Sequence, residues 1–164
     1  MCQRRDGTVY PVTGSVQVAD AAGVTLVYLV LNDITDRVAA EDAIRAAERR
    51  TRTITDNLPA LIAYIDAEQR YRFMNATYAV WLQRPVVEML GRTLAEVHDP
   101  ALYALLEPHV ARALSGQRES FELEQQRAGR TYYVRGVFVP ERDADGRVSG
   151  VYALTQDATR IRLA

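Results

Sequence analysis

The sequence predicts an α+β fold: a five-stranded antiparallel sheet with short helices on one face, preceded by a β-hairpin and a linker helix. The first observation is the order of patterns between residues 61 and 156, which is two strands, several short helices and then three strands. One sheet covered by helices closes a core of this size. The second observation is a match between the start and the end of the 164-residue chain, which indicates a partial second copy of the same unit.

The internal repeat joins GTVYPVTG near the start to GRTYYVRG near the end, and both fit G-x-x-Y-x-V-x-G. Tyr10 and Tyr132 are 122 residues apart, and further along VYLVLNDITDR matches VYALTQDATRI at a spacing of 124. Repeats of roughly 20–50 residues would indicate a solenoid. The longer spacing indicates tandem copies of a whole domain, the first represented only by its last part. The alternative is two unrelated hairpins with similar turns.

The first copy is predicted to contain two strands, at residues 8–18 and 24–31, which are rich in Val, Tyr and Leu. A helix is then predicted over residues 36–57, which are rich in Ala, Glu and Arg and contain no Gly or Pro. Thr35 or Asp36 can serve as its N-cap, because both side chains carry an oxygen that accepts from a free helical N–H.

Small and apolar residues recur along this helix at alternating spacings of four and three, which is a heptad seam. The seam predicts that two such helices lie side by side. An amphipathic helix packed on its own domain is the open alternative. The seam consists of Ala40, Ile44, Ala47, Thr51, Ile54 and Leu58.

The complete copy begins with predicted strands at residues 61–66 and 71–74, separated by a polar turn. Asn75 is a favourable N-cap residue for the helix that follows. That helix is predicted to carry Tyr78, Trp81 and Leu82 on one face.

A longer helix is predicted over residues 100–115, with a kink or a restart at Pro108, which lacks a backbone N–H. Three strands complete the domain, at about residues 118–127, 130–140 and 147–156. The helix is predicted to turn Leu102, Leu105, Leu106, Val110, Ala113 and Leu114 inward.

Composition excludes several classes of protein. The 20 basic residues, all Arg, balance 21 acidic ones to a net charge of -1, so no overall field favours nucleic acid or an anionic membrane. The bias toward Arg and Ala is typical of a GC-rich bacterial genome. Cys2 is the single cysteine, the N-terminus does not resemble a signal peptide, and no apolar run is long enough to span a bilayer. We therefore expect a cytoplasmic protein without membrane contact.

The sequence does not present a convincing catalytic set. Glu122 and Glu124 alternate with apolar residues on one strand, as on a solvated face, and there is no nucleophile elbow or P-loop. His98 is expected to be a surface or capping residue. His109 is expected to be a solvated or hydrogen-bonded helix residue.

Nearly the whole chain resembles the PAS family of sensory domains. NLPALIAYIDAEQRYRFMNATYAVWLQRPVVEMLGRTLAEV is similar to their N-terminal half, and LYALLEPHVARALSGQRESFE to their long helix and third strand. The chain also contains the Asp-x-Thr step of the PAC motif, with which many PAS domains join the last strand to an output helix. It occurs twice, at Asp33 and Thr35 and at Asp157 and Thr159.

This resemblance implies a sensory-box module of a bacterial signal-transduction protein, such as a two-component system, whose output domain would be a histidine kinase or a diguanylate cyclase. The module itself is expected to be non-catalytic. The implied segments are 1–35, the C-terminal hairpin of a truncated upstream PAS domain; 36–58, a linker (signalling) helix; 59–159, a complete PAS domain; and 160–164, the start of an output linker.

Seven side chains are expected to point into the domain, where they would line a pocket for a small molecule that the sequence does not identify. If side chains fill this space, the domain is instead a ligand-free dimerisation or interaction module. Haem and flavin are not expected, although some haem-binding PAS domains place their axial ligand on the helix that carries His109. No metal is expected. The pocket residues are Tyr78, Trp81, Phe121, Leu123, Tyr132, Val134 and Phe138.

We expect a homodimer that pairs through the linker helix and the N-terminal hairpin. The hairpin has too much apolar surface to remain bare, and a lone hairpin is marginally stable in water. It could alternatively pack on the complete domain of its own chain, or be exposed only because the rest of its domain is missing.

Overall fold

The computed structural model describes residues 1–162, in two compact units that comprise Met1–Thr51 and the chain from Arg52 onward. The end of the expected output linker, residues 163 and 164, lies outside the described residues. None of the described helices combines the length and the apolar character that crossing a bilayer requires.

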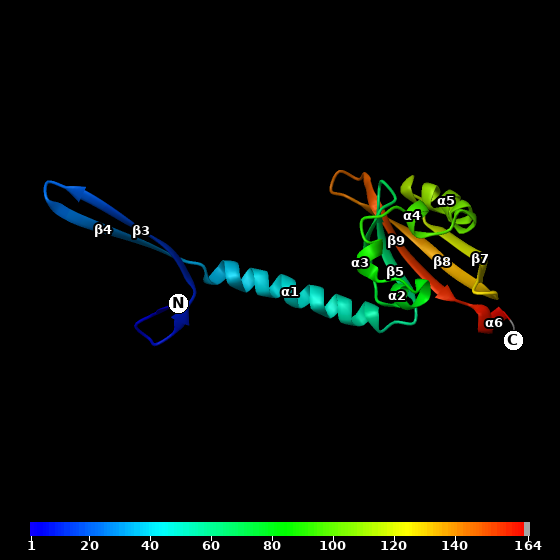
Figure 1. Ribbon diagram of the computed structural model, residues 1–164, viewed down its shortest axis with the longest axis horizontal. Helices are drawn as coiled ribbons and strands as arrows, with labels where there is room; N and C mark the ends of the chain where they lie inside the picture. Colours follow the sequence, from blue (N-terminus) through cyan, green and yellow to red (C-terminus); the bar gives the residue numbers. More distant parts are fainter. Residues whose placement is uncertain (163–164) are drawn as a thin grey trace. The chain divides into compact units, whose positions relative to one another are not determined.

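The first unit is a long antiparallel hairpin of β3 (Val12–Ala21) and β4 (Val24–Asp33), joined by a tight turn. The short strands β1 (Cys2–Gln3) and β2 (Val9–Tyr10) pair with each other before it. The helix α1 (Thr35–Asp56) follows directly after β4 (Figure 1). The two predicted strands and the predicted helix are thus present, and the strands are longer than the sequence indicated.

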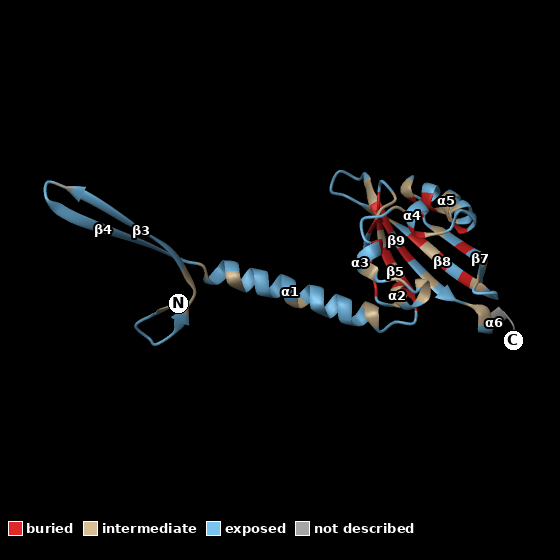
Figure 2. Ribbon diagram, viewed as in Figure 1, coloured by how far each residue is buried: buried red, intermediate tan, exposed pale blue. Residues whose placement is uncertain are grey.

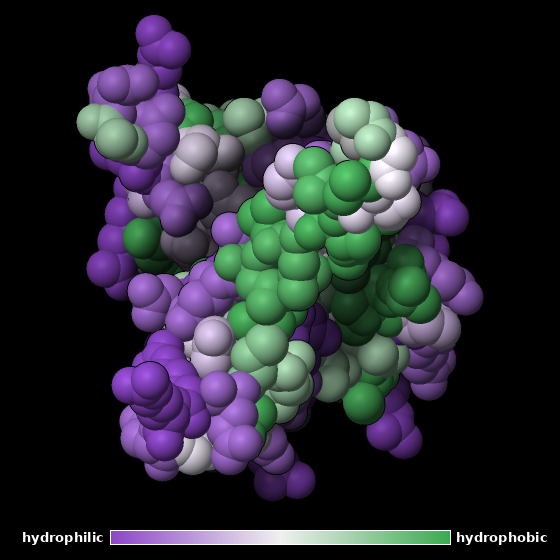
Figure 3. All heavy atoms as spheres, turned by 90° about the vertical axis from the view of Figure 1, so that its left-hand side faces the viewer, coloured by the Kyte–Doolittle hydropathy of each residue, from purple (hydrophilic) through white to green (hydrophobic). Residues whose placement is uncertain are grey.

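The hairpin exposes its apolar side chains. All of β4 is exposed, and Val16 and Val18 on β3 are more than 60% exposed (Figure 2). The space-filling view shows apolar atoms gathered in a continuous band (Figure 3). Helix α1 has no buried residue, and its seam residues Ile44 and Ile54 are about 60% exposed. Within Met1–Thr51, no described residue buries these side chains of the hairpin or Ile44.

The second unit contains a five-stranded sheet in which every neighbouring pair is antiparallel, in the order β6-β5-β9-β8-β7. This confirms the predicted fold class. No helix interrupts the last three strands (Figure 1). The strands are β5 (Leu61–Asp66), β6 (Tyr71–Met74), β7 (Glu119–Arg127), β8 (Arg130–Arg142) and β9 (Val148–Asp157).

The helices between β6 and β7 pack on this sheet and close one core, in which Ile65 and Val151 of the sheet meet Leu94 and Val110 of the helices. All four side chains are at most 1% exposed. The helices are α2 (Thr77–Leu82), α3 (Val86–Met89), α4 (Leu94–Val97) and α5 (Pro100–Leu114), and α6 (Thr159–Arg162) follows the last strand.

Of the kink or restart expected at Pro108, the restart does not occur, since α5 is one helix from Pro100 to Leu114. The expectation that Leu105 points inward is wrong. Leu105 is 47% exposed, whereas Leu102 and Val110 are buried. With 3.6 residues per turn, Leu105 lies roughly a quarter turn away from the direction shared by Leu102, Leu106 and Val110, so it falls outside the buried stripe.

Asn75 is not the N-cap that the sequence predicted. The residue before α2 is Ala76, which makes no side-chain cap, while the Asn75 side chain is fully buried. Its amide oxygen accepts from the Ile62 N–H at 3.0 Å, and its NH₂ group donates to the carbonyls of Thr55 and Ala60 at 2.7 and 2.8 Å. Asn75 therefore satisfies backbone groups of neighbouring segments in place of a helix end.

The two copies of the repeat share one strand register. Val12 pairs with Asp33 as Val134 pairs with Asp157, and the same shifts of 122 and 124 residues relate the two pairs. The backbone N–H of Ile34 bonds to the Pro11 carbonyl, as its counterpart in the second copy does. The hairpin thus has the geometry of β8 and β9. Its assignment to an upstream domain stays a prediction.

Candidate functional site

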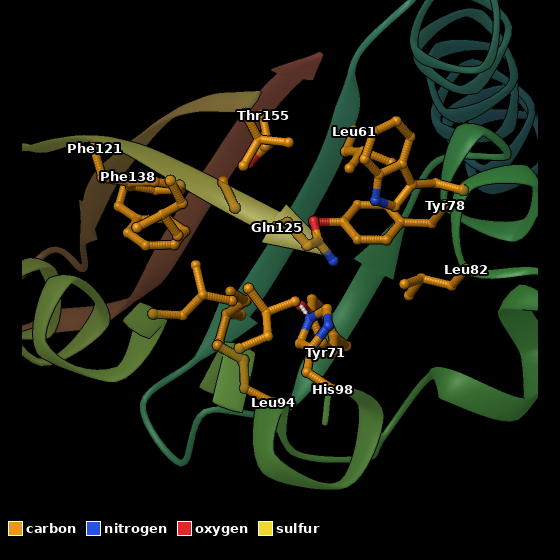
Figure 4. A pocket seen from close by; sticks show the side chains of 17 residues that line it. Leu61, Tyr71, Tyr78, Leu82, Leu94, His98, Phe121, Gln125, Phe138 and Thr155 are labelled. Atoms are coloured by element: carbon orange, nitrogen blue, oxygen red, sulfur yellow. Dashed lines mark hydrogen bonds between the residues drawn. The ribbon is translucent and has the colours of Figure 1, made fainter. Parts of the chain in front are cut away.

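A cavity lies between the sheet and helices α2, α4 and α5. A water-sized sphere can move its centre through about 50 Å³ of it. Its walls are mostly apolar, with polar groups from Tyr71, His98, Gln125 and Thr155 (Figure 4). We call this cavity the inner chamber. Of the seven predicted pocket residues it is lined by six, namely Tyr78, Trp81, Phe121, Leu123, Val134 and Phe138.

A close strand contact fixes the aromatic wall of the inner chamber. The rings of Phe121 and Phe138 lie 4.8 Å apart, on neighbouring strands. Gly136, which pairs with Phe121, leaves room for that ring, since a Cβ there would come within 2.0 Å of it. A glycine at this position of β8 therefore leaves space for the tip of the Phe121 ring.

The polar part of the inner chamber is a pair formed by Tyr71 and His98. The Tyr71 hydroxyl lies 2.7 Å from Nε2 of His98. The Tyr78 ring meets the Tyr71 ring edge-on, with centroids 5.9 Å apart. His98 is the C-cap residue of α4, which agrees with the capping role that the sequence suggested, but it is not a surface residue, because its ring lines the cavity.

Burial controls ionisation in this pair. It lowers the pKa of His98 to about 4, with a further decrease from Arg84 and an opposing increase from Asp99. It raises the pKa values of Tyr71 and Tyr78 well above their usual range. All three side chains are therefore neutral near pH 7. Nδ1 of His98 is buried and has no hydrogen-bond partner among the residues that the structure describes, so the pair has one hydrogen-bonding position open to a ligand or a water.

A second, wider cavity of about 560 Å³ adjoins the inner chamber and shares residues such as Trp81, His98 and Gln125 with it. We call it the vestibule. Its lining is more polar and includes Asp99, Arg127 and Arg130. Tyr132, the seventh predicted pocket residue, lines the vestibule and not the inner chamber.

Arg127 is held against two aromatic rings of the vestibule. Its guanidinium carbon lies 4.5 Å from the centroid of Trp81 and 5.3 Å from that of Tyr132. The two rings meet edge-on at 5.2 Å. Nη1 of Arg127 is buried and, within the described part of the chain, has no hydrogen-bond partner. This cation is thus positioned by stacking and retains an unused donor.

His109 lies outside both chambers. Its Nδ1 is 3.1 Å from Glu119 Oε2, and Arg112 donates to the same carboxylate. These two partners lower the pKa of Glu119 to about 2. His109 is therefore the hydrogen-bonded helix histidine that the sequence predicted. Across the described residues, no group of three or more His, Cys, Asp or Glu side chains is arranged to hold a metal ion.

Both Asp-x-Thr steps lie where a strand turns into a helix. The Asp157 carboxylate accepts from the Thr159 N–H at 2.9 Å, and the Asp33 carboxylate accepts from the Thr35 N–H at the same distance. The aspartate therefore caps each helix, and not Thr35 or Asp36 as the sequence suggested. The Thr159 hydroxyl accepts from the backbone N–H of Tyr133 at 3.0 Å.

Comparisons with known proteins agree on one family. A family model described as PAS fold matches residues 55–163. The methanogenesis regulatory histidine kinase FilI of Methanothrix harundinacea is 27% identical over 162 residues, which is 98% of this chain and 18% of that protein. The chain therefore spans less than a fifth of the length of this curated relative.

Solved PAS structures share the fold. The PAS domain of Bordetella pertussis BvgS is 25% identical, with a TM-score of 0.58, over 72% of this chain and 91% of that domain. A sensory box sensor histidine kinase of Vibrio cholerae is 16% identical, with a TM-score of 0.55, over 73% of this chain and 98% of the other. VqmA of Vibrio cholerae, solved bound to DPO, is 17% identical, with a TM-score of 0.57, over 66% of this chain and 56% of the VqmA chain.

Proposed function

This chain belongs to the PAS family, and from this premise we propose that residues 59–159 form a sensory domain that binds a small molecule in the inner chamber and the vestibule. Binding of that molecule would then act on the segment that follows Thr159. The role of the domain is binding and relay, without catalysis. A protein with the same fold, VqmA, has been solved with a ligand.

The observation that carries the proposal is the pair of buried polar atoms without partners, Nδ1 of His98 and Nη1 of Arg127, among the described residues. Buried polar groups in folded proteins are nearly always hydrogen-bonded. Both residues line the vestibule, and His98 lines the inner chamber as well. A ligand with polar and apolar parts would satisfy these groups while it fills the cavity, as a fully packed core would not.

Two neighbouring residues of β8 link the vestibule to the junction between β9 and α6, which we call the output junction. Tyr132 lines the vestibule, and the next residue, Tyr133, holds the junction through both of its backbone groups. Its N–H donates to the Thr159 hydroxyl, and its carbonyl accepts from the Ala158 N–H at 2.7 Å. A ligand that moves Tyr132 would therefore displace the start of α6.

We propose that the sensory domain works within a longer cytoplasmic protein that carries an output domain. The curated relative is a histidine kinase, and a kinase output fits that likeness. A diguanylate cyclase remains the other output that the sequence analysis suggested.

A ligand screen on the 164-residue chain tests the binding function. Trp81 is the only tryptophan and lines both chambers, so its fluorescence reports binding directly. Native mass spectrometry would detect a molecule that purifies with the protein. Leu123→Phe narrows the inner chamber and should abolish the change in Trp81 fluorescence on ligand binding. Val139→Phe, at a residue that lines neither chamber, should keep that change. If no compound purifies with the chain or changes Trp81 emission, the binding function is wrong.

A second candidate function is ligand-free dimerisation. It is favoured by the exposed apolar side chains of the hairpin and by the exposed seam of α1. In this case residues 1–58 would bring two chains together, and the sensory domain would transmit only the geometry of the pair. The shared register of the two repeats supports a related proposal, that residues 1–35 are the end of an upstream PAS domain.

A further inference from the structure

We propose that the ligand of this site is a small monocarboxylate, whose carboxylate binds Arg127 in the vestibule and whose short apolar body enters the inner chamber. The inference rests on the proposed binding function and names the chemical class of the ligand.

The first argument is the state of Arg127. A guanidinium keeps its charge at any pH a protein tolerates, and it can only donate hydrogen bonds. Stacking on Trp81 and Tyr132 fixes the plane of this group, but it uses none of the N–H donors. Nη1 is buried without an acceptor from the described residues. A carboxylate matches the fork of an arginine in charge and in shape.

The charges around the vestibule favour a single negative charge on the ligand. Its lining has two guanidinium groups, Arg127 and Arg130, and one carboxylate, Asp99, which leaves one positive charge in excess. The Asp99 carboxylate already accepts from the Leu102 N–H at 3.0 Å. His98, which also lines the vestibule, is neutral near pH 7. A doubly charged phosphate would gain from Arg127 but would be repelled by Asp99.

The inner chamber sets the shape of the other end of the ligand. No arginine is among its lining residues, all of which the structure describes, so it offers no cation to a carboxylate. Apolar side chains, including Leu61, Leu106 and Phe138, supply most of its wall. The space open to the centre of a water-sized sphere is about 50 Å³, which favours a short branched alkyl group such as isobutyl over a fused aromatic ring. The vestibule, which shares Trp81 with the inner chamber, holds the remainder.

A pair of matched probes tests the inference. We would titrate the full chain with 4-methylpentanoate and with its neutral amide, 4-methylpentanamide, by calorimetry and by Trp81 fluorescence. The acid should bind at least about tenfold more tightly than the amide, because only the acid forms a charge-assisted bond with Arg127. Inorganic phosphate at the same concentrations should not compete with it.

Substitutions then locate the carboxylate. Arg127→Gln should weaken binding of the acid by about tenfold or more and leave binding of the amide nearly unchanged. Arg127→Lys, which retains a positive charge but not the planar fork, should lie between the wild type and Arg127→Gln. Arg135→Gln is the matched control. Arg135 lies on β8, the strand that pairs with the strand of Arg127, forms an ion pair with Glu122, and lines neither chamber. This variant should bind both probes like the wild type.

The outcomes separate this inference from the binding function. Equal binding of acid and amide, an unchanged affinity in Arg127→Gln, or competition by phosphate would each overturn the carboxylate assignment. A tight-binding amide would still support a small-molecule sensor. If neither probe binds, the carboxylate assignment is wrong, and the binding function is also wrong only if the ligand screen finds no other compound.

Discussion

Asn75 shows how much of this domain depends on a single amide. Its side chain bonds to backbone groups of Thr55, Ala60 and Ile62, and it is fully buried. It therefore joins the end of α1 and the start of β5 to the residue after β6. Removing the amide would leave the Ile62 N–H and the Ala60 carbonyl without this partner, and a buried group without a partner costs about 1–3 kcal/mol. The Thr55 carbonyl would keep its bond from the Leu58 N–H.

We predict that Asn75→Ala lowers the free energy of unfolding by about 2–4 kcal/mol, because the Ile62 N–H and the Ala60 carbonyl lose their partner at once. Urea denaturation followed by circular dichroism measures this change. Asn57→Ala is the control, because Asn57 is exposed, follows the last residue of α1, and its side-chain NH₂ donates to the Thr53 carbonyl of that helix. It should cost less than about 1 kcal/mol. Similar losses in the two variants would contradict the bridging role.

His98 predicts how stability varies with pH. Burial lowers its pKa from 6.5 to about 4, so between these values the unfolded chain binds a proton that the folded chain does not. The free energy of unfolding should be highest above pH 6.5 and fall as the pH drops toward 4, by at most about 3 kcal/mol. Glu119, whose pKa is lowered from 4.5 to about 2, contributes only below pH 4.5.

His98→Gln, which retains a polar side chain that does not titrate, should flatten the curve between pH 6.5 and 4.5. Denaturant midpoints measured at half-unit intervals of pH would show this. An equal slope in the variant and the wild type would mean that another group controls stability in that interval.

His109 predicts a negative result with haem. Its Nδ1 is engaged by Glu119, and its ring packs 5.2 Å from that of Phe121. We therefore expect no Soret band after haem is added to the purified chain. A Soret band that disappears in His109→Ala would show that the histidine is an axial ligand and would contradict this expectation.

The sequence identified the apolar wall of the site but not its polar groups. Alternation along a strand places Phe121 with Leu123, and helical spacing places Tyr78 with Trp81, so their inward direction could be derived. His98 and Tyr71 are brought together by the fold, 27 residues apart in the chain. Neither local pattern nor residue type indicates such a contact. Asn75 was misassigned for a related reason, since its residue type favours helix caps and its burial depends on tertiary structure.

At the scale of elements, an aspartate caps the helix at both strand-to-helix junctions, but the two threonine hydroxyls bond to different partners. The Asp33 carboxylate accepts both the N–H and the hydroxyl of Thr35. The Thr159 hydroxyl instead accepts from Tyr133. Pro11 occupies the position of Tyr133 in the first copy, and proline has no N–H to donate. The two copies of one motif therefore use their threonines differently.

This difference predicts unequal effects at the α1 junction. Asp33→Ala should cost about 1 kcal/mol of helix stability, because the Thr35 N–H loses its capping acceptor. Thr35→Ala should cost less, because the cap remains. Hydrogen exchange of the amides in the first turn of α1, measured by NMR, would detect both changes. If Thr35→Ala has the larger effect, the threonine is the cap.

Pro108 shows that burial in the core can keep a helix continuous at a residue that disfavours helix. A proline inside a helix removes the hydrogen bond to the carbonyl four residues earlier, here that of Ala104. Helix α5 nevertheless continues to Leu114, because Leu102 before the proline and Val110 after it are buried in the same core.

Strand positions were easier to predict, since the residues 61–66 and 71–74 are largely apolar runs bounded by turns and match β5 and β6.

At the scale of the whole molecule, we predict that the 164-residue chain forms a homodimer. The hairpin and α1 expose many apolar side chains, and no described residue of the first unit covers them. Burying apolar surface favours association by roughly 25 cal/mol per Å². Light scattering coupled to size exclusion should therefore report twice the monomer mass of 18.4 kDa.

Truncation identifies which segment pairs. If the hairpin alone drives association, removing residues 1–35 should give a monomer. A dimer that survives this truncation but not the removal of residues 1–58 would assign the contact to α1. A monodisperse monomer of the full chain would refute the dimer.

The missing N–H of Pro11 has a mechanical consequence. Beyond the aspartate cap that both junctions share, two hydrogen bonds fasten the start of α6 to the backbone of Tyr133. At α1, the Ile34 N–H alone bonds to Pro11. The α1 junction has a side-chain link instead, because Arg4 donates to the Asp33 carboxylate. The start of α6 is thus tied to the backbone of its own sheet, whereas the start of α1 is tied in part through an exposed ion pair. A load passing from strand to helix would therefore run through different groups at the two junctions, and only the one at α1 would be weakened by salt.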